Sequence, residues 1–115
     1  MQYALLIYTD EKQDAEATKE QMDATMAAYF QFGEQYKDKI TGGEALMPTQ
    51  SATTVRAPEG RAITTDGPFA ETKEQLGGFY LVNAENLDEA IEIAARIPGA
   101  RYGSIEVRPV MAFDQ

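Results

Sequence analysis

The fold is decided by two apolar stretches, Tyr-Ala-Leu-Leu-Ile-Tyr at residues 3–8 and Gly-Gly-Phe-Tyr-Leu-Val at residues 77–82. Both are apolar at nearly every position and are too short to stand as free helices, so each predicts a strand buried on both faces. The paired glycines that open the second stretch suit a bulge or a close approach of another backbone. These two strands are therefore expected to form the centre of a sheet.

Two amphipathic helices are predicted, at residues 18–38 and 86–97. Thr18 with Gln21, and Asn86 with Glu89, have the spacing of capping boxes, in which each side chain satisfies a backbone amide at the helix start. Pro98-Gly99 ends the second helix. The apolar stripes expected to pack in the core are Met22, Met26, Tyr29, Phe30 and Tyr36 in the first helix, and Leu87, Ala90, Ile91, Ala94 and Ile97 in the second.

Shorter strands are predicted at residues 40–46, 51–56, 61–65 and 103–110, with Pro58 and Gly60 reversing the chain into a hairpin. The succession of strand, helix, several strands, helix and strand predicts an α+β fold in one domain over residues 1–115. The expected topology is ferredoxin-like, with two helices on one face of an antiparallel sheet.

One face of this sheet is left uncovered, because two helices cover a single face while the strands carry apolar side chains on both. Four strands about 4.8 Å apart, each of five residues at about 3.3 Å, expose roughly 300 Å². A patch of that size lies at or above the largest apolar patch of a typical monomer. The sequence therefore predicts that a second copy covers it in a two-fold, face-to-face homodimer.

The composition excludes several classes of function. The 115 residues include 19 Asp and Glu against 10 Lys and Arg, for a formal net charge of −9, so neither nucleic acid nor an anionic membrane is an expected partner. The chain has no His and no Cys, which removes a Cys nucleophile and any site that needs an imidazole base. No cofactor and no metal are predicted, and a cytoplasmic location is expected because the opening residues lack a leader pattern.

The densest group of chemically useful residues lies at 64–78, where the chain leaves a strand, turns sharply and re-enters the sheet. One interpretation is a well-made connection, in which Asp66 bonds nearby amides, Pro68 stiffens the turn and Phe69 anchors the loop in the core. The other is that the loop sets two carboxylates and an ammonium at the rim of a cleft. Both interpretations are open from the residues alone.

This stretch resembles the YCII-related proteins, in the branch that carries an Asp-Gly-Pro-Phe motif. The matching residues are Asp66-Gly67-Pro68-Phe69-Ala70-Glu71-Thr72-Lys73-Glu74, supported by Tyr8 at the end of the first strand, by residues 43–46 and 52–56, and by Glu106-Val107-Arg108-Pro109. The resemblance implies a dimeric α+β barrel, and an enzyme that uses a His and Asp pair in a cleft between sheet and loops. The His is absent here, so only Asp66 is carried over, as a candidate carboxylate.

The leading hypothesis is a small-molecule-binding protein that performs proton transfer or elimination on a small polar or aromatic acid. Asp66 is the candidate base, and burial or a like charge would have to raise its pKa. Candidate ligand-binding residues are Tyr8, Glu44, Arg56, Glu71 and Lys73.

Each of these candidates has a structural alternative. Glu44 and Glu71 supply a like charge or are solvated surface residues, Arg56 and Lys73 orient an anion or keep the surface soluble, and Tyr8 lines a pocket or packs in the core. The second hypothesis is a non-catalytic dimeric accessory or regulatory module that uses residues 66–74 as an interaction surface.

Overall fold

The computed structural model describes residues 1–113 and contains a four-stranded antiparallel sheet in the order β2-β5-β1-β6. The strands are β1 (Gln2–Thr9), β2 (Ile40–Ala45), β5 (Gln75–Asn83) and β6 (Ser104–Pro109). The two apolar stretches at residues 3–8 and 77–82 form the central pair β1 and β5, as predicted. The α+β class with an antiparallel sheet is confirmed.

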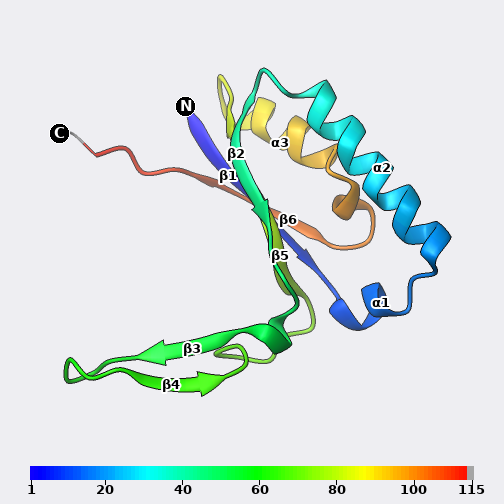
Figure 1. Cartoon of the computed structure of the whole chain (residues 1–115). Coiled ribbons are helices and arrows are strands. Elements are labelled where there is room, and N and C mark those ends of the chain that lie inside the picture. The colour runs from blue at the N-terminus through cyan, green and yellow to red at the C-terminus, as the bar shows by residue number, and fades with distance from the viewer. Residues whose placement is uncertain (114–115) are drawn as a thin grey trace.

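Helices α2 (Lys19–Gln35) and α3 (Leu87–Ala95) lie on the same side of the sheet (Figure 1). Both N-caps are confirmed: the Thr18 hydroxyl accepts from the Gln21 amide at 3.1 Å, and the Asn86 side chain accepts from the Glu89 amide at 2.9 Å. The number of helices was wrong, because a short helix α1 (Glu11–Ala15) follows β1. Asp10 caps α1 by accepting from the Lys12 amide, a local bond that supports helix in a stretch without an apolar stripe. No helix among the described residues is long and apolar enough to cross a membrane.

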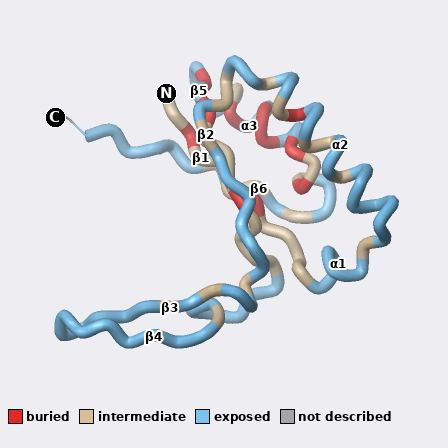
Figure 2. Tube along the Cα trace, in the orientation of Figure 1, coloured by how far each residue is buried: buried red, intermediate tan, exposed pale blue. Residues whose placement is uncertain are grey.

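The core lies between the sheet and the two long helices, where the buried segments of Figure 2 face one another. Leu5 and Val82 from the sheet are 0% exposed, and Ile93 and Ile97 meet them from the helical layer. The chain turns from Ile97 into the 3-10 turn η2 (Pro98–Arg101) before β6. The apolar residues Ile105 and Val107 of β6 pack against the same core.

The expected core stripe of α2 was partly wrong. Phe32, which was not among the expected residues, is 3% exposed, whereas Met26 and Phe30 are 71% and 70% exposed. Phe30 and Phe32 are two residues apart and therefore about 200° apart around the helix, so the sheet buries only one of them. Tyr29 and Tyr36 do pack on the core beside Phe32, and Met22 is exposed near the helix start. In α3, Leu87 and Ile91 are likewise exposed, and Ile93 takes their place in the core.

Among residues 1–113, no helix lies on the opposite face of the sheet (Figure 1). Residues paired across antiparallel strands share a face, so the register places Phe79 and Leu6 side by side there, between Glu44 on β2 and Glu106 on β6. The next row sets Leu81 and Ala4 beside Arg108. This open face is thus apolar along the two central strands and charged along both edges. We call it the open face below.

The predicted hairpin is present but does not belong to the main sheet. Strands β3 (Thr53–Arg56) and β4 (Ile63–Asp66) form a separate two-stranded ribbon, which we call the arm (residues 53–66). It leaves the main sheet after β2 and the 3-10 turn η1 (Thr49–Ser51) and extends on the side away from the helices (Figure 1). The Cα radius of gyration is 16.1 Å, against about 13 Å for a compact chain of this length.

Candidate functional site

The candidate base Asp66 ends β4 at the root of the arm, where it pairs with Thr53. The next residue, Gly67, has a φ of 96°, in the left-handed region that favours glycine. Its amide donates to the Ala52 carbonyl at 2.7 Å, and its own carbonyl accepts from the Thr54 hydroxyl at 2.8 Å. These bonds fix the backbone that carries Asp66, while its side chain remains exposed to solvent.

The loop beyond Gly67 does not anchor itself in the core. Phe69 is 79% exposed, so the expectation that its ring packs inside was wrong. Glu71 and Lys73 are exposed as well. Among residues 1–113 the ion pairs are Lys19 with Asp23 and Lys39 with Glu89, so neither charge of this loop is held by a salt bridge there. The side chains of this loop are therefore available to a ligand or to another chain.

A polar cluster that no sequence pattern predicts connects the end of this loop to the sheet. The Glu11 carboxylate accepts from the Thr49 amide at 2.8 Å and from the Thr49 hydroxyl at 2.7 Å, while the Glu11 amide donates to the Gln75 side chain at 2.9 Å. Glu74 accepts from the Ser104 hydroxyl at 2.8 Å. Only tertiary structure joins these residues, since they come from four separate parts of the chain.

The other candidate residues occupy two different places. Tyr8 and Glu44 lie on the open face, where Tyr8 pairs with Leu76 and Ser104, and Glu44 pairs with Phe79. Arg56 lies in the arm at the opposite end of the ladder from Asp66. Three residues separate Arg56 from Thr53, the cross-strand partner of Asp66, which corresponds to about 10 Å along the strand.

Arg56 and Asp66 also point to opposite faces of the arm. Cross-strand partners share a face and successive residues alternate, so Asp66 and Thr53 lie on one face whereas Arg56 and Ile63 lie on the other. One copy of the chain therefore does not bring Asp66 and Arg56 onto a single ligand. Neither of the two hollows described next includes either residue.

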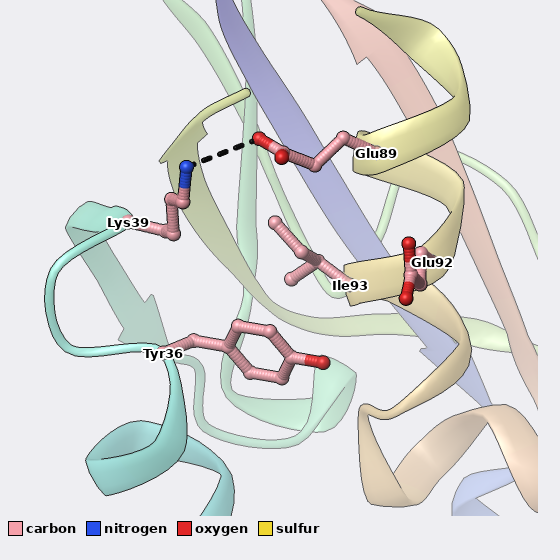
Figure 3. Close-up of a pocket in the computed structure, with 5 residues that line it drawn as sticks. All are labelled: Tyr36, Lys39, Glu89, Glu92 and Ile93. Carbon is pink, nitrogen blue, oxygen red and sulfur yellow. Dashed lines mark hydrogen bonds and ion pairs between the residues drawn. The ribbon is translucent and has the colours of Figure 1, made fainter. Parts of the chain in front are cut away.

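The first hollow, of about 130 Å³, lies between the end of α2 and α3 (Figure 3). Tyr36 and Lys39 line one side, and Glu89, Glu92 and Ile93 line the other. The Lys39 ammonium lies 3.3 Å from Glu89, and the Glu85 amide together with Lys39 lowers the pKa of Glu89. This ion pair connects the residue before β2 to the first turn of α3. We therefore assign the two charges to stabilising the fold.

The second hollow is an apolar groove of about 260 Å³ between α3 and β6, lined by Ile91, Ala94, Ala95, Ala100, Ile105 and Val107. No side chain that lines this groove is titratable. The groove could therefore bind an apolar group, but its lining residues could not transfer a proton. Within residues 1–113, no three acidic side chains gather closely enough to hold a metal ion.

A group of tyrosines near α1 was also missed. Burial, together with nearby Tyr102, Tyr80 and Asp14, raises the pKa of Tyr29 to about 12, while a hydrogen bond with the Gly99 backbone acts in the opposite direction. Burial also raises the pKa values of Tyr80 and Tyr102. These hydroxyls stay protonated at neutral pH. The six tyrosines of the sequence were the one indication of this group. Tyr29, Tyr80 and Tyr102 come from three separate elements, so only the fold brings them together.

Comparison with known proteins agrees with this architecture. The model of the YCII-related domain matches residues 1–114. The chain is 40% identical over 117 residues to an uncharacterized protein of Rhizobium meliloti (strain 1021), covering 98% of this chain and 94% of that one. A solved structure of 5-chloro-2-hydroxyhydroquinone dehydrochlorinase from Burkholderia phenoliruptrix AC1100, in complex with 2,5-dihydroxybenzoquinone, is similar with a TM-score of 0.58 and 16% identity, covering 96% of this chain and 94% of that chain. At that identity the likeness concerns the fold.

Proposed function

Because the chain belongs to the YCII-related family, we propose that it binds a small molecule and carries out a proton transfer or an elimination on a small polar or aromatic acid. We place it in the branch with the Asp-Gly-Pro-Phe motif on the strength of residues 66–69. The observation that carries the proposal is that a protein of the same fold, aligned over 96% of this chain, is named as a dehydrochlorinase of a small hydroquinone.

Asp66 is the group we assign as base. The chain contains no histidine, and the hydrogen-bonded root of the arm carries Asp66 at the start of the loop that exposes Glu71 and Lys73. In the reaction, Asp66 accepts a proton from the substrate. The electron pair left behind either takes up a proton at another atom, which is an isomerisation, or expels a leaving group such as a halide, which is an elimination. Neither outcome needs an oxidant, and Lys73 supplies the positive charge that orients an anionic substrate.

A second copy of the chain is part of this proposal. The open face presents Leu6, Phe79 and Leu81 between charged edges, and no helix or strand in the described part of the chain covers it. A face-to-face dimer would remove these side chains from water and pair the Arg108 edge of one copy with the acidic edge of the other. The second copy would also approach the root of the arm, where Asp66 lies.

The test uses two probes taken from the chemistry of the similar fold. Calorimetry measures binding of 2,5-dihydroxybenzoquinone, and a chloride electrode follows release of chloride from 5-chloro-2-hydroxyhydroquinone. We expect Asp66→Asn to lower the rate of chloride release about 100-fold or more with binding of the quinone retained. Lys73→Gln should weaken quinone binding about tenfold, the value of one charge-assisted hydrogen bond. Glu34→Gln, an exposed acid on α2, is the matched control and should change neither quantity. Wild-type protein without binding or turnover of either probe, or Asp66→Asn with the wild-type rate, would contradict the proposal.

The non-catalytic alternative is favoured by one observation, the 79% exposure of Phe69 in a loop that also exposes Glu71 and Lys73. An exposed aromatic ring flanked by opposite charges is typical of a protein-binding hot spot. Under this alternative, a photoreactive residue at position 69 captures one heterologous protein in high yield, and reversing both charges abolishes the capture. Capture of only a second copy of this chain, or of nothing, would remove the alternative.

A further inference from the structure

Residues 49–74 run outside the four-stranded sheet, between β2 and β5, and they contain both the arm and the loop that carries Lys73. Apart from half-buried Thr54, every residue of the arm is exposed, so the arm buries little surface of its own (Figure 2). A two-stranded ribbon of this kind is marginally stable in water. The orientation of the arm relative to the sheet therefore depends on what holds the two ends of residues 49–74.

Glu11, the first residue of α1, holds both ends. Its carboxylate accepts hydrogen bonds from the backbone amide of Thr49 at 2.8 Å and from the Thr49 hydroxyl at 2.7 Å, where the chain enters residues 49–74. The Glu11 backbone amide donates to the side-chain oxygen of Gln75 at 2.9 Å, where the chain returns to the sheet. One residue just after β1 thus contacts the entry and the exit at the same time.

On the entry side, the hold extends from Thr49 to the candidate base. Thr49 begins η1, and its carbonyl accepts from the Ala52 amide at 2.9 Å. The Ala52 carbonyl in turn accepts from the Gly67 amide at 2.7 Å. Two successive backbone hydrogen bonds therefore connect the residue that Glu11 binds to the residue that directly follows Asp66.

On the exit side, the hold extends from Gln75 to the loop that carries the ammonium. The Gln75 side-chain amide donates to the Thr72 carbonyl, while its oxygen accepts from the Glu11 amide. Thr72 directly precedes Lys73, the residue that we assign to orient an anionic substrate. The Gln75 side chain therefore links Glu11 to the backbone beside Lys73.

A purely local role for Glu11 does not account for these bonds. The helix dipole favours an acidic residue in the first turn of a helix whatever else that residue contacts. Both carboxylate oxygens of Glu11, however, are engaged by Thr49, which lies 38 positions further along the chain. In the part of the chain that the structure describes, neither ion pair includes Glu11. Its charge is therefore met by the two donors of Thr49, and such charge-assisted bonds are about twice as strong as neutral ones.

We propose that Glu11 is a positioning residue that fixes Asp66 relative to Lys73. Its carboxylate sets the root of the arm through Thr49, and its amide sets the loop through Gln75, so both halves of the proposed site depend on it. This inference rests on the proposed function for the roles of Asp66 and Lys73, whereas the hold on both ends stands on the hydrogen bonds alone. Glu11 acts through these contacts and not on the substrate.

The first experiment needs no ligand and follows amide hydrogen exchange by NMR. We expect Glu11→Ala to raise the exchange rate of the Gly67 amide about tenfold or more, the value of a hydrogen bond to a charged group, with the amides of β1 unchanged. Glu11→Gln should stay close to the wild-type rate, because its oxygen accepts from the Thr49 amide and its nitrogen donates to the Thr49 hydroxyl. Glu16→Ala, an exposed acid just after α1, is the matched control. A wild-type rate at Gly67 in Glu11→Ala, or an equal rise throughout β1, would overturn the proposal.

The second experiment asks whether Glu11 acts through the base. Glu11→Ala should slow chloride release from 5-chloro-2-hydroxyhydroquinone about 10- to 100-fold, the range that misplacement of a reacting group causes, with a much smaller change in the affinity for 2,5-dihydroxybenzoquinone. In an Asp66→Asn background it should cause no further loss, since no base is left to position. An equal loss in both backgrounds would contradict the positioning role. Wild-type protein that does not turn the probe over defeats the proposed function, and the exchange rate at Gly67 then decides whether Glu11 holds the arm.

Discussion

Raising the pH above 10 should destabilise this protein through ionisation of the Tyr29 hydroxyl. The pKa of Tyr29 is raised to about 12 by burial first of all, with Tyr102 from the loop before β6, Tyr80 from β5 and Asp14 from α1 adding to the effect. In the unfolded chain the phenol titrates near 10. The folded state thus holds this proton more tightly, so the stabilising effect is complete below pH 10 and is lost as the pH rises from 10 toward 12.

The size of the effect follows from the two pKa values. A difference of two pKa units corresponds to about 2.7 kcal/mol. Because solvent partly reaches the ring, screening reduces the expected loss to about 1–2 kcal/mol by pH 12. Urea unfolding followed by circular dichroism at pH 9, 10 and 11 measures it, at one protein concentration because a dimer gains stability with concentration.

Tyr29→Phe is the control for this prediction. It removes the titrating hydroxyl and keeps the ring, so its free energy of unfolding should fall less steeply above pH 10, although Tyr80 and Tyr102 still contribute. Equal slopes for wild type and variant between pH 9 and pH 11 would refute the reasoning, because Tyr29 would then titrate alike in the folded and unfolded states.

Four further substitutions test the packing and one helix cap. Phe32→Ala should destabilise the protein by about 3–5 kcal/mol, whereas Met26→Ala should change stability by no more than about 0.5 kcal/mol; equal effects in thermal unfolding would mean that the helix is rotated from the described orientation. Gly103→Ala should lower the free energy of unfolding by about 1–3 kcal/mol, because a Cβ atom there would approach the Tyr8 carbonyl oxygen too closely. A variant with the wild-type melting temperature would contradict that contact. Asn86→Ala removes the cap of α3 and should cost about 1 kcal/mol, with Asn86→Asp as the variant that restores it.

Local features were predictable from the sequence because neighbouring residues cause them. The Thr18 capping box depends on residues three apart, and both of its bonds are present. The paired glycines mark a real irregularity, since the register between β1 and β5 shifts where Gly77 is skipped. Helix α1 was missed because it has no apolar stripe, and the Asp10 cap alone was not recognised as a helix start.

The candidate site was less predictable because its parts come together only through the fold or through a second chain. Asp66 was identified from its motif, and it remains a prediction about function. The separation of Asp66 from Arg56 depends on the register of the arm, and a one-residue slip would put both on the same face. The polar cluster of Glu11, Thr49 and Gln75 joins residues that are far apart in the chain, so no spacing could reveal it.

The sequence by itself determined the central strands, the starts of α2 and α3, and the presence of too few helices to cover two apolar sheet faces. Continuous apolar runs and capping residues act over a few neighbouring positions, so they can be recognised without the fold. Only the tertiary structure decided which face of α2 is buried and that residues 53–66 leave the sheet as an arm. Those outcomes depend on which surfaces meet, since a helix with apolar residues on two sides buries the side that the sheet fits, and a hairpin joins a sheet only where an edge lies within its reach.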